Sequence, residues 1–312
     1  MIEWVVFVIS LAGLYYGAEW LIRGALRIAY QLHVSPMFVG LTIVAFGTSL
    51  PELIVSILAS FSNQGNLAVG NVVGSNICNI GLILGLSAVI RPLRIQLSSV
   101  QKDVPLLIAT SLAGLWVISD KRISLWEGLF LFAGLVAFVF FNYRQSRNAK
   151  EEVLLSELPE RQETVSGKMG IAVLWVLAGG IFLSVSAKGF IWSALAISRS
   201  LGLPDTFIAL TLVSVGTSLP ELATSVVAAF KGNSDIAVGN VVGSNLFNLL
   251  GILGITAILH PIVSEGIHLS DLLVMCGLSA LVLPFIRSRF RLERWEGGIL
   301  LLIYGIYVIL LV

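Results

Sequence analysis

Long apolar stretches separated by short polar turns run along the whole sequence. Most of them approach or exceed the roughly 20 residues that a helix needs to cross a bilayer. On this criterion we predict ten membrane-spanning helices. Five precede a polar linker at 144–168 and five follow it: 2–29, 37–61, 67–90, 104–119 and 124–143, then 169–198, 206–230, 236–259, 269–286 and 295–311. The pattern is typical of an all-α membrane protein.

Composition agrees with this interpretation. The 312 residues are 57% hydrophobic and 12% charged, whereas soluble domains carry about 25% charged residues. The net charge of +1 gives no sign of a nucleic-acid partner. Two cysteines are too few for a disulfide scaffold. The partner that the sequence indicates is the lipid bilayer, and nothing in it points to an obligate protein partner.

Two short motifs each occur twice at one fixed spacing. Gly-Thr-Ser-Leu-Pro-Glu stands at 47–52 and again at 216–221, and Gly-Asn-Val-Val-Gly-Ser-Asn stands at 70–76 and again at 239–245. The offset is 169 residues in both cases (221 − 52 and 239 − 70). The surrounding sequence aligns without a gap at this offset, and more than half of the aligned residues are identical. This is the mark of an internal duplication.

The duplication and the span count together predict an inverted architecture. Residues 1–143 and 169–312 form repeats of five spans each, and an odd number places the second repeat upside down relative to the first. Inverted repeats with polar breaks at the membrane midplane are characteristic of alternating-access transporters. Basic residues concentrate in the loops after the odd-numbered spans. The positive-inside rule therefore places the 144–168 linker in the cytoplasm and both termini outside.

The first motif is predicted to break its helix. Pro51 lacks an N–H and clashes with the preceding turn, and Gly47 loosens the backbone just upstream. Backbone groups freed at membrane depth are tolerated only where they line a cavity or are buried in protein. Glu52 enters this break with Thr48 and Ser49. The second motif brings the equivalent residues from the opposite side of the membrane, namely Thr217, Ser218 and Glu221.

A purely structural interpretation of the motif is a capping box, in which Ser49 caps the new helix and Glu52 bonds back to it. It must also explain two ionisable groups near the bilayer centre, each costing at least about 2.5–3.5 kcal/mol. A serine cap alone would avoid that cost. We therefore favour an ion site in which the two glutamates face each other.

The residues around these breaks supply oxygen ligands. Hard cations such as Ca²⁺ take six to eight oxygens and favour negative charge. Asn79 and Asn248 follow Ser75 and Ser244 by one helical turn, so each pair shares a face. A buried asparagine can also serve as a helix–helix hydrogen bond, but the placement of both in the repeated segments favours site lining.

Glu19, Arg23 and Lys188 are among the further charged residues inside the predicted spans. Glu19 can pair with Arg23 one turn on. Lys188 either extends its ammonium to the interface or partners an acid, two interpretations that the sequence leaves open.

The paired motifs resemble the two alpha repeats of the sodium/calcium exchanger family, of the short prokaryotic type, and the likeness extends over the whole chain. The resemblance implies that Glu52 and Glu221 are central ligands shared by Ca²⁺ and Na⁺, and that the backbone carbonyls of Thr48 and Thr217 complete the calcium site. It also implies that spans one and six slide across the rest to switch access. The remaining implied ligands are the side chains of Ser49, Ser218, Ser75, Ser244, Asn79 and Asn248 and the carbonyls of Ala45 and Ser214.

The expected function is secondary antiport of Na⁺ against Ca²⁺ in the cytoplasmic membrane, with calcium extruded. No enzyme activity and no cofactor are expected. Asn248 stands where potassium-dependent relatives carry Asp, which argues against a potassium requirement. Two alternatives remain: a proton-coupled calcium antiporter on the same fold, and a channel with a carboxylate filter.

Overall fold

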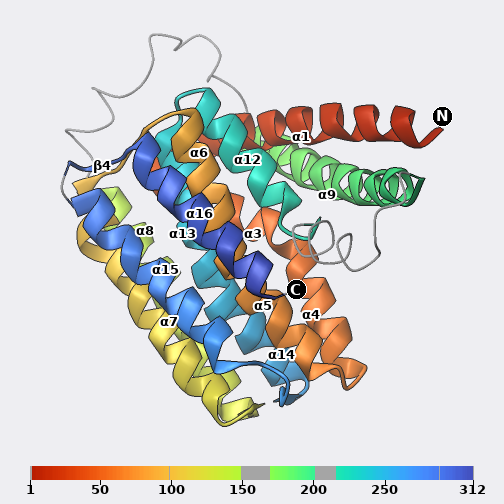
Figure 1. Ribbon diagram of the computed structural model, residues 1–312. Coiled ribbons are helices and arrows are strands. Elements are labelled where there is room, and N and C mark those ends of the chain that lie inside the picture. Colours follow the sequence, from red (N-terminus) through yellow and green to blue (C-terminus); the bar gives the residue numbers. More distant parts are fainter. Residues whose placement is uncertain (1, 98, 149–168, 201–215, 288, 312) are drawn as a thin grey trace.

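The computed structural model describes residues 2–97, 99–148, 169–200, 216–287 and 289–311 (Figure 1). Within these ranges the chain is helical almost throughout, with four strands of two residues each. Seven of the described helices are long and apolar enough to cross a membrane, or eight when one bent pair counts as a single span. The predicted all-α architecture is thus confirmed within these ranges, and the ten spans and their inversion stay predictions. Most of the predicted linker and the start of the seventh predicted span lie outside the described residues.

The first half of the chain begins with the long helix α1 (Ile2–Leu32), and a bent span of four pieces follows it. The pieces are α2 (Pro36–Val39), the π-helical turn η1 (Gly40–Val44), α3 (Ala45–Thr48) and α4 (Leu50–Phe61). The next elements are α5 (Gly65–Cys78), η2 (Asn79–Leu84), α6 (Gly85–Ile90), β1 (Leu93–Arg94), η3 (Ser99–Asp103), α7 (Val104–Ser119), β2 (Arg122–Ile123) and α8 (Leu125–Asn148).

The second half repeats this order where it is described, except that α15 follows β3 without the π-helical turn that precedes α7. Its elements are α9 (Met169–Ser200), α12 (Leu219–Phe230), α13 (Ser234–Leu246), η6 (Phe247–Ile252), α14 (Leu253–Leu259), β3 (Ile262–Val263), α15 (Leu269–Arg287), β4 (Arg291–Leu292) and α16 (Arg294–Leu310). The last helix has 17 residues, slightly fewer than the roughly 20 that a straight crossing needs.

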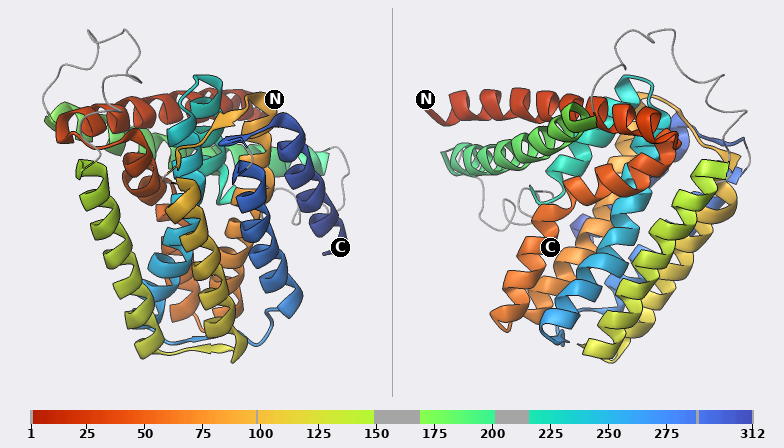
Figure 2. Two further views of the ribbon diagram at one scale, coloured as in Figure 1. Left: turned by 90° about the vertical axis from the view of Figure 1, so that its left-hand side faces the viewer. Right: turned by 180° about the vertical axis from the view of Figure 1, so that it is seen from behind.

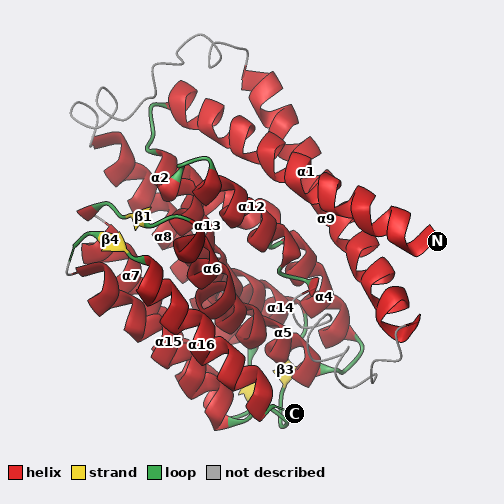
Figure 3. Ribbon diagram, turned by 45° about the horizontal axis from the view of Figure 1, so that its top comes forward, coloured by secondary structure: helices red, strands yellow, loops and turns green. Residues whose placement is uncertain are grey.

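The helices α1 and α9 lie side by side and cross one end of the bundle at a steep angle (Figures 1 and 2). Gly13 lies against Ser186, and Gly24 lies against Ala172, so the two helices run antiparallel. Small residues at these contacts allow the backbones to approach closely. Figure 3 shows the pair along one flank of the remaining helices. The two helices therefore pack closely against each other, and most side chains in the first half of α1 are exposed or half-buried.

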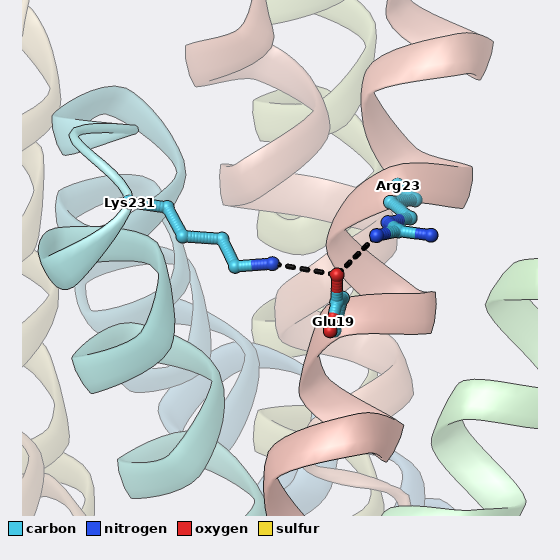
Figure 4. Close-up of polar contacts among 3 residues, drawn as sticks. All are labelled: Glu19, Arg23 and Lys231. Atoms are coloured by element: carbon cyan, nitrogen blue, oxygen red, sulfur yellow. Dashed lines mark hydrogen bonds and ion pairs between the residues drawn. The ribbon is translucent and has the colours of Figure 1, made fainter. Parts of the chain in front are cut away.

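A cluster of three charges joins this unit to the bundle (Figure 4). Lys231, which follows α12, places Nζ 2.7 Å from Oε1 of Glu19 on α1. Arg23, one turn further along α1, pairs with the same carboxylate oxygen, as its spacing predicted. Lys188 lies exposed on α9.

The middle of the bundle is formed by α5 and α13, the most deeply buried of the membrane-length helices. Short antiparallel strand pairs close the bundle at its two ends. Leu93 pairs with Leu292 in the β1–β4 pair, and Ile123 pairs with Ile262 in the β2–β3 pair. At the 169-residue offset β1 corresponds to β3 and β4 corresponds to β2, so the two strand pairs are equivalent. The strands were absent from the sequence prediction because each has only two residues.

The last helix of the first half is longer than the apolar stretch that predicted it. The fifth span was predicted to end at 143, and α8 continues to Asn148. Arg144 stacks over the ring of Phe140, 4.4 Å from its centroid. Ser146 accepts a 2.7 Å hydrogen bond from the backbone N–H of Ser35. These contacts stabilise a polar turn of helix beyond the apolar stretch.

Candidate functional site

The first repeated motif breaks its helix at Ser49, as predicted. The helices on either side, Pro36–Thr48 and Leu50–Phe61, meet at 48°. Ser49 has φ −87° and ψ 7°, and Ser218 has nearly the same values, φ −85° and ψ 9°. A proline follows each serine by two residues, where its missing N–H costs no hydrogen bond. Neither serine makes a side-chain cap hydrogen bond. The capping-box interpretation is therefore wrong.

The two glutamates are brought together in the interior. Glu52 and Glu221 are each only 1% exposed, and their carboxylates are close enough to interact electrostatically. Ser49 donates a 2.7 Å hydrogen bond to Oε1 of Glu221. Ser218 lies beside the carboxylate of Glu52 without closing a hydrogen bond to it. Each serine thus faces the glutamate of the other motif.

Asparagines of the second motif tie the breaks to the rest of the bundle. Asn240 donates to the backbone carbonyl of Glu221 at 3.3 Å and to the hydroxyl of Ser225 at 2.9 Å. Its side-chain oxygen accepts a 3.1 Å hydrogen bond from Thr48 in the opposite motif. One amide therefore fixes the start of α12 and the threonine across from it.

The same arrangement recurs at the 169-residue offset. Asn71 donates to the carbonyl of Glu52 at 3.2 Å and to Ser56 at 3.0 Å. Thr217 places its hydroxyl 3.5 Å from Oδ1 of Asn71, a longer contact than its counterpart. The breaks are thus held by equivalent residues from both halves of the chain.

Four more asparagines meet where α5 and α13 cross. Asn79 donates to the side-chain oxygen of Asn245 at 2.9 Å, and Asn248 donates to that of Asn76 at 2.9 Å. Asn76 and Asn245 also donate to each other's backbone carbonyls at 3.4 Å. A π-helical turn begins at or next to the outer asparagine of each helix. Such turns concentrate at functional sites.

Several buried oxygens of these segments have no hydrogen-bond partner among the described residues. They include both carboxylate oxygens of Glu52 and Oε2 of Glu221. The others in the predicted site are Oδ1 of Asn79, Oδ1 of Asn248 and the hydroxyls of Ser218 and Ser244. An unsatisfied buried polar group costs about 1–3 kcal/mol, and native proteins keep few of them. Carboxylate, amide and hydroxyl oxygens together form a ligand set that suits a hard cation.

The remaining predicted residues fall near or outside this region. Ser75 and Ser244 are buried on α5 and α13, and Ala45 is buried at the start of α3, just before the first break. Ser214 lies outside the described residues. In the part of the chain that the structure describes, no cluster of three or more His, Cys, Asp or Glu side chains is present.

Sequence reasoning missed Asn71 and Asn240, which hold the breaks, and Asn76 and Asn245, which cross between α5 and α13. All four belong to the second repeated motif. The fixed offset was a usable signal, because a polar residue retained at the same position in both motifs inside an apolar span needs a partner.

Comparison with known proteins adds independent evidence. The model of the family described as "Sodium/calcium exchanger protein" matches residues 2–144 and 171–312. The sodium/calcium exchanger MaX1 of Methanosarcina acetivorans is 30% identical, with 98% of each chain covered. The inner membrane protein YrbG of Escherichia coli is 34% identical over 81% of this chain and 79% of its own.

Solved structures agree with the sequence comparisons. A structure of the sodium-calcium exchanger NCX_Mj soaked with 10 mM Na⁺ and zero Ca²⁺ superposes with a TM-score of 0.83. The two chains are 30% identical, and 98% of each is covered. The similarity therefore extends over the repeated motifs and the helices around them.

Proposed function

Because the chain belongs to the sodium/calcium exchanger protein family, we propose that it exchanges Na⁺ for Ca²⁺ across the cytoplasmic membrane by alternating access and extrudes calcium. The observation that carries this proposal is the set of unpartnered buried oxygens around Glu52 and Glu221. Two carboxylates without a cation partner are costly at membrane depth. A bound Ca²⁺ or several Na⁺ would neutralise them.

The two glutamates are the central ligands in this proposal. The backbone carbonyls of Thr48 and Thr217 complete a calcium site between them. Flanking Na⁺ sites draw on the remaining predicted ligands, namely the side chains of Ser49, Ser218, Ser75 and Ser244 and the carbonyls of Ala45 and Ser214. Asn79 and Asn248 line the middle of the cavity, and their unpartnered amide oxygens support that assignment.

Coupling follows from competition for one charged site. With both carboxylates ionised, the empty site has a charge near −2. Either one Ca²⁺ or several Na⁺ can neutralise this charge, but the two kinds of ion cannot occupy the site together. A neutralised site can be enclosed in the bilayer interior, whereas bare carboxylates resist desolvation. Only loaded states then change access, so each movement of one ion requires a return movement of the other.

The change of access is proposed to occur between ten helices arranged as two inverted five-helix repeats, 1–143 and 169–312, joined by a cytoplasmic linker at 144–168. The antiparallel packing of α1 on α9 supports the inversion. The paired contacts of Thr48 with Asn240 and of Thr217 with Asn71 support it as well. The α1–α9 pair, which lies along one flank of the other helices (Figure 3), is the unit proposed to slide.

The test is radioactive calcium uptake into sodium-loaded proteoliposomes diluted into sodium-free buffer. Uptake is expected to require the outward sodium gradient and to be lost in Glu52→Gln and Glu221→Gln. Glu265→Gln, which alters an exposed carboxylate outside the repeated motifs, is the matched control and should transport normally.

Two further arms separate the alternatives. Uptake driven by a pH gradient with no sodium present would replace Na⁺ by H⁺ as the coupling ion. Single-channel currents through the purified protein would contradict antiport altogether. Coupled uptake retained in both glutamate variants would overturn the site assignment.

A further inference from the structure

A second polar site lies at one end of the bundle, away from the repeated motifs. A cavity of about 400 Å³ opens between the β1–β4 strand pair and the first turn of α13. Its charged lining consists of Arg94, Arg289, Arg291 and Asp235, with Gln96 beside them. We call it the arginine cavity. Three positive charges against one negative leave it with a net charge near +2.

The strand register forces two of these charges together. Arg94 on β1 is the direct cross-strand partner of Arg291 on β4. Directly opposite residues have Cβ atoms about 4.5–5.5 Å apart, and like charges in that position are destabilising. A compensating anion within reach of both guanidinium groups would relieve this repulsion.

The acidic groups nearby are already engaged. Asp235 accepts a 2.8 Å hydrogen bond from the side chain of Gln96. Glu293 approaches Arg291 only to 3.8 Å, and its carboxylate also caps the first turn of α16. Nε of Arg291 is buried and has no hydrogen-bond partner among the described residues. A directed donor therefore remains unused in a strongly positive cavity.

The opposite end of the bundle provides an internal comparison. At the 169-residue offset, the β1–β4 pair corresponds to the β2–β3 pair, where Arg122 faces Val263. The cavity there has almost the same volume, about 420 Å³. Its charged lining is Asp120, Lys121, Arg122 and Glu265, so positive and negative charges balance. The two ends of the bundle share the same strand-pair architecture, but only the arginine cavity carries an excess of positive charge.

Exposed apolar side chains occur at the arginine cavity and near its lining residues in sequence. Phe290 lines the cavity, Leu97 follows Gln96, and Trp295 lies four residues after Arg291; all three are exposed. Trp and other apolar side chains beside basic residues are typical of the membrane–water interface. A ligand at this depth would have an anionic head and an apolar remainder.

We infer that the arginine cavity binds a phosphate group, supplied by the head of an anionic phospholipid. Guanidinium groups bind phosphate oxygens in bidentate fashion. One phosphate between Arg94 and Arg291 would remove their mutual repulsion and give Nε of Arg291 an acceptor. Exposed apolar side chains next to the cavity would contact the acyl chains.

The experiment is native mass spectrometry of the purified full chain in neutral detergent, with phosphatidylglycerol and phosphatidylcholine offered at equal concentration. The wild type is expected to retain phosphatidylglycerol in preference. The double variant Arg94→Gln/Arg291→Gln should lose about tenfold in retention, in line with the loss of charge-assisted hydrogen bonds. Arg122→Gln, which changes the equivalent position at the other end, should retain the lipid like the wild type.

Inorganic phosphate distinguishes the two sources of the group. Release of the lipid by millimolar phosphate would support the phosphate site and assign it to a soluble anion. Equal retention of phosphatidylglycerol by the wild type and the double variant, or an equal loss in Arg122→Gln, would overturn the inference. Should the double variant fail to fold, Arg289→Gln, at an exposed position of the same cavity, is expected to reduce retention alone. Lipid retention does not depend on ion exchange, so this test stands apart from the proposed function.

Discussion

The hydroxyl of Ser49 donates a 2.7 Å hydrogen bond to Oε1 of Glu221, 172 residues further along the chain. The equivalent serine, Ser218, lies beside Glu52 and makes no such bond. The serine at each helix break therefore faces the glutamate of the opposite motif, but only one of the two pairs is closed. The two carboxylates occupy similar positions with unequal partners.

This inequality predicts different effects of two matched substitutions. Ser49→Ala removes the hydrogen bond to Glu221 and should lower the free energy of unfolding in ion-free detergent solution by about 1–3 kcal/mol. Ser218→Ala removes only a looser contact with Glu52 and should lower the free energy of unfolding by less than Ser49→Ala does. Thermal melts of both variants check this, and equal losses would contradict the difference between the two pairs.

Glu52→Gln is expected to raise the melting temperature in ion-free buffer, because an unpartnered buried charge is costly. Calcium should stabilise the wild type by binding the folded state and should have no such effect on Glu52→Gln. Melts with and without calcium measure both effects. Glu265→Gln is the control that keeps the calcium-induced shift, and a full shift in Glu52→Gln would remove Glu52 from the site.

Substitution of the asparagine at each break should destabilise the protein, and the asparagine with the shorter contacts should have the larger effect. Asn240→Ala removes the donor to the carbonyl of Glu221 and leaves the hydroxyl of Ser225 without the amide that it bonds, at about 1–3 kcal/mol for a group left unsatisfied. Asn71→Ala should cost less, because Ser56 keeps the carbonyl of Ala68 as a partner and the contact of Asn71 with Thr217 is longer, at 3.5 Å. Both variants should weaken apparent calcium affinity in the uptake assay. A larger effect of Asn71→Ala on either readout would refute this order.

The close packing of α1 on α9 makes Gly179 sensitive to a single methyl group. A Cβ at this position would lie 2.6 Å from the backbone nitrogen of Leu21, so the two helices must separate. Gly179→Ala is expected to destabilise the protein by about 1–3 kcal/mol and to slow exchange. A Cβ at Gly170, on the same helix, meets nothing within 4 Å. Gly170→Ala should leave stability and exchange unchanged.

Most helix positions could be predicted from the sequence, because bilayer-length apolar stretches leave few alternatives. The break at Ser49 could be predicted as well, since Pro51 permits no continuous helix through it. The end of α8 could not, because it depends on the hydrogen bond between Ser146 and Ser35, far apart in sequence. The two-residue strands likewise depend on pairing between the two halves.

The candidate site also has features that the sequence predicts and features that it does not. The duplicated motif is enough to identify Glu52 and Glu221 as a pair, and the fold brings their carboxylates together. The motif does not reveal which serine bonds which glutamate, because that depends on how the two halves face each other. Asn240 escaped notice for a related reason: its partner Thr48 lies 192 residues away.

The ion pair of Glu19 with Lys231 has a consequence for the transport cycle. At the 169-residue offset these residues correspond to Lys188 and Ser62, so the mirrored contact would set a lysine against a serine. When each half takes up the conformation of the other during a change of access, the Glu19–Lys231 ion pair breaks and no equivalent ion pair forms. A partly exposed pair contributes about 0.2–1 kcal/mol, up to about a fivefold bias in population. The loaded carrier should therefore favour one of its two access states, and the two half-cycles should run at different speeds.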